Sequence, residues 1–106
     1  MRAGRRNVYL TIEDRSEDSI DSVGDPVVTW STYSTQWAEV ITQGGKEFLE
    51  ARQQHSSLSH IVRIRYVDGV RPTMRINNGG EYYNILAVYD PSKRRETLTM
   101  YCDEQT

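Results

Sequence analysis

Hydrophobic and polar residues alternate most clearly in the segment HIVRIRYVDG, residues 60–69. Successive side chains of a β-strand point to opposite sides, so this alternation predicts a strand with two distinct faces. One face carries His60, Val62, Ile64 and Tyr66, and the other carries Ile61, Arg63, Arg65 and Val67. The first face is typical of a core. The second face is compatible with nucleic acid binding, with a protein contact or with exposure to water.

Similar alternation predicts further short strands along the chain. They cover residues 8–13, 27–33, 35–42, 73–77, 81–90 and 96–102. The sequence Asn77-Asn78-Gly79-Gly80 between two of them predicts a tight hairpin, because Asn and Gly tolerate the positive φ angles of such turns. Residues 46–54 have helical composition and predict one short α-helix between the third and fourth strands.

An acidic segment separates the first two predicted strands. Residues 13–25 carry a net charge of −5 and are rich in serine, so we expect residues 14–25 to form a long, mobile loop. Together these elements predict a mainly β fold: a small antiparallel β-barrel or sandwich of about six to seven short strands, with one short helix and a long acidic loop after the first strand.

Length and composition limit the class of protein. A chain of 106 residues is sufficient for one domain, and no apolar run is long enough to cross a bilayer. The first residues have no apolar core typical of a signal peptide, so we expect the chain to remain in the cytoplasm of the cell that makes it. Among 13 basic residues only Lys46 and Lys93 are lysine, and this arginine bias favours contacts with carboxylate or phosphate.

The candidate motifs for chemistry are incomplete. His55 and His60 lack the third ligand of a zinc signature, and Cys102 is the single cysteine. Gly44-Gly45-Lys46 lacks the remaining residues of a phosphate-binding loop, the serines have no nucleophile-elbow context, and the acidic segment lacks the regular ligand spacing of a calcium loop. We therefore expect no enzyme activity, no metal and no cofactor.

One functional alternative follows from the predicted barrel itself. Small OB- or SH3-like barrels bind single-stranded nucleic acid through exposed aromatic residues beside basic ones. Arg63, Arg65 and Arg75 near Tyr82 or Tyr101 would suit such a module. The sequence pI of about 5.6 and the acidic segment weaken the electrostatic footprint that a general nucleic acid binder requires.

Several segments together are similar to a known family. They are GDPVVTW (24–30), WAEV (37–40), GGKEFLEA (44–51), HIVRIRY (60–66), MRI (74–76), YYNILAVYD (82–90) and RRETLTMYC (94–102). In this order and at these spacings the chain resembles the head closure, or head-tail joining, proteins of tailed bacteriophages. The resemblance covers nearly the whole chain and implies a single head-closure-like β-barrel domain over residues 1–106.

The resemblance also implies a function. It implies a non-enzymatic virion protein, made in the host cytoplasm, that forms a ring of roughly twelve-fold symmetry at the head-tail interface. Such a ring closes the DNA-filled head, retains the genome and provides the platform for tail attachment. Its partners would be the portal-adaptor protein, the tail completion or tail terminator protein and, without sequence specificity, the packaged double-stranded DNA; no membrane is involved.

Two roles are open for the acidic segment. In the similar proteins a long loop can project into the central channel, and Glu17, Asp18 and Asp21 would then line that channel. Alternatively the same carboxylates dock on Arg63, Arg65 or Arg75 of the next subunit or of a partner. We prefer docking for part of the segment, because mobile acidic segments commonly become ordered on binding.

Overall fold

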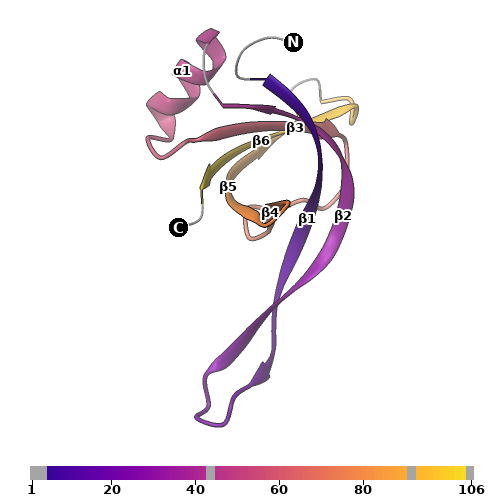
Figure 1. Ribbon diagram of the computed structural model, residues 1–106, viewed down its shortest axis with the longest axis vertical. Helices are drawn as coiled ribbons and strands as arrows, with labels where there is room; N and C mark the ends of the chain where they lie inside the picture. Colours follow the sequence, from indigo (N-terminus) through magenta and orange to yellow (C-terminus); the bar gives the residue numbers. More distant parts are fainter. Residues whose placement is uncertain (1–4, 43–44, 91–92, 105–106) are drawn as a thin grey trace.

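The computed structural model describes residues 5–42, 45–90 and 93–104. These residues form six β-strands and one α-helix (Figure 1). The elements are β1 (Arg5–Ile20), β2 (Pro26–Ile41), α1 (Gly45–Gln54), β3 (His60–Arg65), β4 (Arg75–Asn78), β5 (Glu81–Tyr89) and β6 (Thr97–Glu104). The described helix is neither long nor apolar enough to cross a membrane.

All six strands belong to one antiparallel sheet, as the alternation predicts. The strand order is β1-β2-β3-β6-β5-β4, and the sheet closes because β4 also pairs with β1. The closing contact is short, since it joins only Thr11–Glu13 of β1 to Arg75–Asn77 of β4. The mainly β prediction is therefore confirmed, with six strands in one closed sheet in place of two facing sheets.

The main hydrophobic core lies inside this closed sheet. Every strand contributes to it, and all except β4 do so with alternate residues; Met74 joins it from the position before β4. The buried members are Leu10, Ile12, Ala38, Val40, Val62, Ile64, Met74, Ile76, Tyr83, Ile85, Leu98, Met100 and Cys102. Val62 and Ile64 are core residues as predicted, His60 is also buried, and Tyr66 packs against the cluster from the residue after β3. The period-2 pattern thus identifies the inner face correctly.

A second, smaller core lies under the helix. Phe48 and Ala51 of α1 pack with Leu58 and with the outward-facing Ile41 and Ile61 of neighbouring strands β2 and β3. A helix of ten residues is marginal alone, and burying this apolar face attaches it to the sheet. The predicted helix over residues 46–54 is therefore confirmed, and it covers part of the outer face of β3.

Two predictions about the first half of the chain are wrong. Residues 14–20 do not form a loop but continue β1, and residues 27–33 and 35–42 belong to one strand, β2, apart from Thr42. The helix therefore lies between the second and third strands. The β-branched segment 27–29 and Trp30 provide the partner strand that holds the serine-rich acidic segment extended, with bulges at Ile12/Glu13 and Ser16/Ser19.

The result is a long hairpin that projects from the closed sheet (Figure 1). Only residues 21–25 remain as its turn. Asp21 stabilises this turn, because its Oδ1 accepts hydrogen bonds from the backbone N–H groups of Val23 and Asp25, each at 3.0 Å. Gly24 provides the φ of +91° that the turn requires.

Candidate interaction surface

Arg63 connects the helix to the outer face of the sheet. Its guanidinium forms ion pairs with Glu47 of α1 and with Glu39 of β2, the latter at 3.8 Å, and donates a hydrogen bond from Nε to Thr99 Oγ1 at 3.4 Å. The side chain is 28% exposed. Two of the outward residues of β3 therefore contact the helix. Ile61 lies under it, and Arg63 holds it in place through Glu47.

Arg75 is also engaged within the chain. Its guanidinium carbon lies 4.1 Å from the ring centroid of Trp30 and 4.0 Å from that of Tyr82, and its Nε donates to Glu13 Oε1 at 2.7 Å. The exposed fractions of the Arg75 and Glu13 side chains are only 16% and 15%. An arginine between two aromatic rings and beside a carboxylate is satisfied in both its stacking and its charge.

Two further contacts fix the base of the hairpin. The Tyr33 hydroxyl donates to the backbone carbonyl of Asp68 at 2.5 Å, and Arg71 forms an ion pair with Asp14 at 3.5 Å. With the Arg75 cluster, they connect both strands of the hairpin to residues 68–82. The direction in which the hairpin leaves the sheet is therefore determined by specific contacts.

Arg65 differs from the other two candidate arginines. It is exposed at the end of β3, and within the described part of the chain its side chain has no ion pair. It lines an open groove of about 600 Å³ on the outer face of the sheet. The groove is formed by Asn7, Trp37, Ala38, Glu39, Arg63, Ile64, Arg65, Glu96 and Thr97.

An exposed aromatic pair lies at this groove. Trp37 is 67% exposed and Tyr9, opposite it on β1, is 57% exposed, with their ring centroids 5.3 Å apart. Trp and Tyr are enriched among the residues that dominate the energy of protein interfaces. We define the groove face as the groove residues together with Tyr9. Neither Tyr9 nor Trp37 was predicted as a site residue from the sequence, although Trp37 in an outward position of an alternating strand was the available signal.

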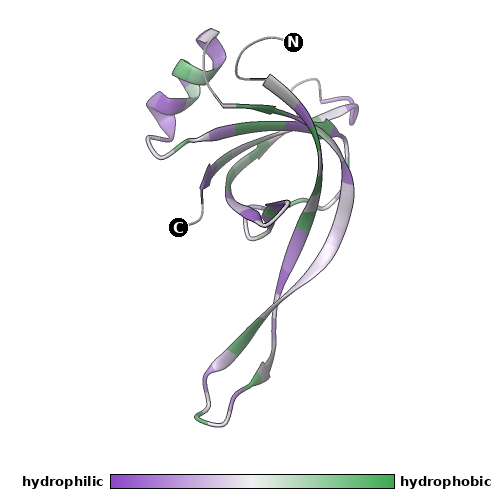
Figure 2. Ribbon diagram, in the orientation of Figure 1, coloured by the Kyte–Doolittle hydropathy of each residue, from purple (hydrophilic) through white to green (hydrophobic). Residues whose placement is uncertain are grey.

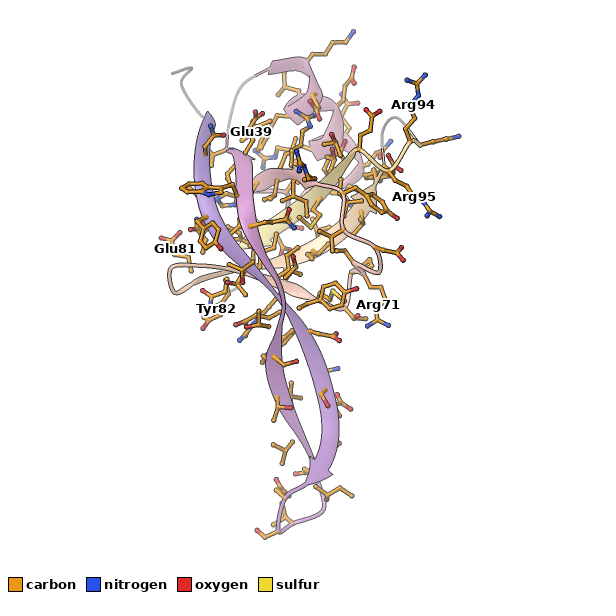
Figure 3. The ribbon with its side chains drawn as sticks, turned by 90° about the vertical axis from the view of Figure 1, so that its right-hand side faces the viewer. Glu39, Arg71, Glu81, Tyr82, Arg94 and Arg95 are labelled. Atoms are coloured by element: carbon orange, nitrogen blue, oxygen red, sulfur yellow. The ribbon has the colours of Figure 1, made fainter. Side chains whose placement is uncertain are left out.

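The three acidic candidates all lie on the hairpin. Glu17 is exposed in β1 and forms an ion pair with Arg15, and Asp21 stabilises the turn. Asp18 belongs to β1, but its side chain lies outside the described residues. The structure does not bring Glu17 or Asp21 near Arg63, Arg65 or Arg75 of the same chain. Figure 3 shows Glu39, which lines the groove, near the end of the molecule opposite the turn of the hairpin.

The titratable groups of the core have structural roles. Burial raises the pKa of the Cys102 thiol far above its ordinary value. Burial, with a smaller effect of the nearby Glu47 carboxylate, also raises the pKa of Tyr101. His60 stacks on Tyr83 at 4.1 Å, and its Nδ1 lies 2.6 Å from Ser59 Oγ. In the described ranges, no group of His, Cys, Asp and Glu side chains is arranged to hold a metal ion.

The geometry therefore defines a class: a small closed-sheet protein that presents a projecting hairpin and an aromatic groove face as its main surface features. The comparison with known families gives the identity. The family model of the phage head completion protein matches residues 1–105, and the chain belongs to this family. It is thus a structural phage head protein, and the resemblance noted in the sequence is confirmed.

Two solved structures share the fold. The solution structure of protein SF1141 from Shigella flexneri 2a is 26% identical with a TM-score of 0.70, and the alignment covers 100% of this chain and 98% of that one. A chain of the virion of a native gene transfer agent particle is 20% identical with a TM-score of 0.61, covering 94% of each chain. No curated protein matches the chain.

Proposed function

We propose that the protein forms a ring at the head-tail interface of the virion, where it closes the DNA-filled head and provides the platform for tail attachment. The observation that carries this proposal is the match of residues 1–105 to the phage head completion family. In a ring of roughly twelve copies, each subunit uses two different surfaces in a head-to-tail manner, one toward each neighbour. The portal-adaptor protein lies on the head side, and the tail completion or terminator protein lies on the tail side.

The shape of the molecule supports this role. The closed sheet is a compact unit, whereas the hairpin extends the longest dimension to 49 Å against 28 and 25 Å for the other two. A projecting arm with a fixed base suits a protein that must reach a neighbour or a channel. The carboxylates of Glu17, Asp18 and Asp21 on this arm repel DNA phosphate, so an arm that faces the channel contacts the packaged DNA without holding it.

The nucleic acid alternative has less support than this role. It required Arg75 and Tyr82 to be available to bases and phosphates, whereas Arg75 stacks on Tyr82 and Trp30 and is paired with Glu13. Arg63 is paired with Glu47 and Glu39. Two of the three arginines that suggested a single-strand-binding surface thus have partners inside the chain, and we do not propose that function.

Deleting the gene from its phage tests the proposal. Full-sized heads are expected to package DNA, to lose it after packaging and to fail to join tails that assemble separately. Electron microscopy counts filled and empty heads, and a joining assay with purified tails measures the second step. Wild-type protein supplied from a plasmid should restore both. Normal virions without the gene, or heads that never package DNA, would contradict the proposed role.

A further inference from the structure

The outer part of the hairpin is attached to the rest of the molecule mainly at its inner end, where Asp14 pairs with Arg71 and Trp30 stacks on Arg75. We call residues 14–32 the outer ribbon; its strands, 14–20 and 26–32, are hydrogen-bonded in the sheet only to each other, because β4 pairs with β1 no further than Glu13. At ~3.3 Å per residue, each of these strand segments is roughly 23 Å long. The principal-axis extent of 49 Å reflects this projection.

The outer ribbon also exposes apolar side chains. Ile20 is 70% exposed and Val23 is 79% exposed at its end, and Val28 is exposed farther back. Figure 2 shows hydrophobic residues recurring along the hairpin up to its turn. A two-stranded ribbon alone is marginally stable in water, and exposed aliphatic residues at its end gain nothing from solvent. A partner that covers this end would stabilise the ribbon and remove the apolar surface from water.

The same chain carries a surface with matching properties. The groove face presents the exposed rings of Trp37 and Tyr9 next to Arg65, and the end of the ribbon presents Ile20 and Val23 next to Asp25. Within the described part of the chain, neither Asp25 nor Arg65 has an ion pair. Each surface therefore offers an apolar patch beside a charged side chain without an ion pair, Asp25 on the ribbon and Arg65 on the groove face, and these two charges are opposite. Glu96 on the groove face and Asp21 on the ribbon also have no ion pair within the described residues.

We propose that the end of the outer ribbon of one copy docks on the groove face of a second copy. In this contact Ile20 and Val23 pack against Trp37 and Tyr9, and the Asp25 carboxylate pairs with the Arg65 guanidinium. Neither Arg63 nor Arg75 takes part, because each is already paired within its own chain.

The position of the two surfaces determines the kind of assembly. The groove residue Glu39 and the turn of the hairpin lie toward opposite ends of the molecule, so a chain cannot dock on itself (Figures 1 and 3). The contact joins two different surfaces and leaves one of each free, which is the property of a heterologous interface that closes into a ring by rotation. This inference rests on the proposed ring and names the contact that builds it.

Crosslinking in assembled particles tests the contact directly. Phage particles are made with a chain that carries both Asp25→Cys and Arg65→Cys, and are treated with a bismaleimide whose reach exceeds the ~6 Å Cα separation that a disulfide requires. Cys102 is buried and does not contribute. A matched variant carries Asp25→Cys with Glu81→Cys, which places the second cysteine on an exposed residue away from the groove.

The proposal expects a ladder of dimers, trimers and larger species on a denaturing gel for the first variant and only monomer for the second. Incorporated chains that give no ladder, or dimers alone, would overturn the contact while leaving the proposed function intact. If the wild-type chain is absent from DNA-filled particles, the proposed function itself fails. Circular dichroism of both variants verifies that the exposed substitutions leave the fold unchanged.

Charge exchange provides a second, independent readout. Asp25→Arg and Arg65→Asp should each reduce incorporation into particles by about tenfold, because each places two like charges in contact. The double variant restores the opposite charges and should recover to within about threefold of wild type. Single variants that incorporate normally, or a double variant as defective as the singles, would contradict the pairing of Asp25 with Arg65.

Discussion

Arg75 is the residue on which the base of the hairpin depends most. Its guanidinium stacks on Trp30 of β2 and Tyr82 of β5 and pairs with Glu13 of β1, so one side chain connects three strands. The sequence named Arg75 as a candidate contact residue for a partner, but it did not indicate that this side chain is covered within its own chain. The side chains that cover it, Trp30, Tyr82 and Glu13, come from three other strands that are distant from one another in the sequence. Only the closure of the sheet brings them together.

Replacing Arg75 should therefore destabilise the protein. We expect Arg75→Ala to lower the free energy of unfolding by about 2–3 kcal/mol, since two cation-π contacts are lost and the largely buried Glu13 carboxylate loses its partner. Arg75→Lys should fall between alanine and wild type, because an ammonium group cannot stack as a plane. Urea unfolding measures both. Arg65→Ala is the matched control and should change stability by less than about 0.5 kcal/mol.

Cys102 gives a prediction about reactivity at the same scale. Its side chain is fully buried in the core, and burial raises the pKa of the thiol, so at neutral pH it is protonated and inaccessible. A thiol reagent such as DTNB should label native protein only at the rate of unfolding and should label it at once in denaturant. Rapid stoichiometric labelling of the native protein would show that β5 and β6 separate more readily than their register indicates.

At the scale of elements, the hairpin is where sequence and structure differ most. Serine and acidic residues at 14–25 have low strand propensity, and on local grounds they predict a loop. Residues 14–20 form a strand because they pair with residues 26–32, which have high strand propensity. The sequence predicted most of that second segment as a strand but did not indicate which strand it pairs with. By contrast, α1 and β3 were predicted closely, because their own periodicity determines their buried faces.

The part of the outer ribbon beyond Ser16 and Thr29 should be dispensable for folding. We expect a chain in which residues 17–28 are replaced by Asn-Gly, joining the paired Ser16 and Thr29, to keep its closed sheet and to unfold within about 1 kcal/mol of wild type. The deleted residues contribute nothing to either buried cluster, and Trp30 remains to stack on Arg75.

Thermal unfolding and two-dimensional NMR spectra measure this outcome. The same variant should fail to restore tail joining in a phage that lacks the gene, which separates the role of the ribbon from the stability of the sheet. A variant that no longer folds would show that the ribbon nucleates the pairing of β1 with β2. Full activity of the shortened chain would show that the ribbon has no part in assembly.

At the scale of the whole molecule, two features of the assembly surface were accessible from the sequence and one was not. The arginine bias and the acidic segment indicated an interface, and both persist in the structure as Arg65 and the hairpin. Their relative position depends on how the sheet closes and on how far β1 and β2 continue past β4, which no local pattern encodes. Hence the sequence suggested the charges of a contact but not that they lie toward opposite ends of the molecule.

This arrangement makes a prediction about the free protein. Because each copy carries one ribbon end and one groove face, self-association should have no built-in stopping point at the dimer. Sedimentation velocity at increasing concentration in low salt should show a series of oligomers. About 0.5 M salt should shift this series toward monomer by screening the proposed Asp25–Arg65 ion pair between copies. Trp37→Ala should weaken the series more than salt does, because large exposed aromatic rings are the side chains that commonly dominate interface energies. A simple monomer-dimer equilibrium would indicate that one surface pairs with itself, and the head-to-tail contact would then be wrong.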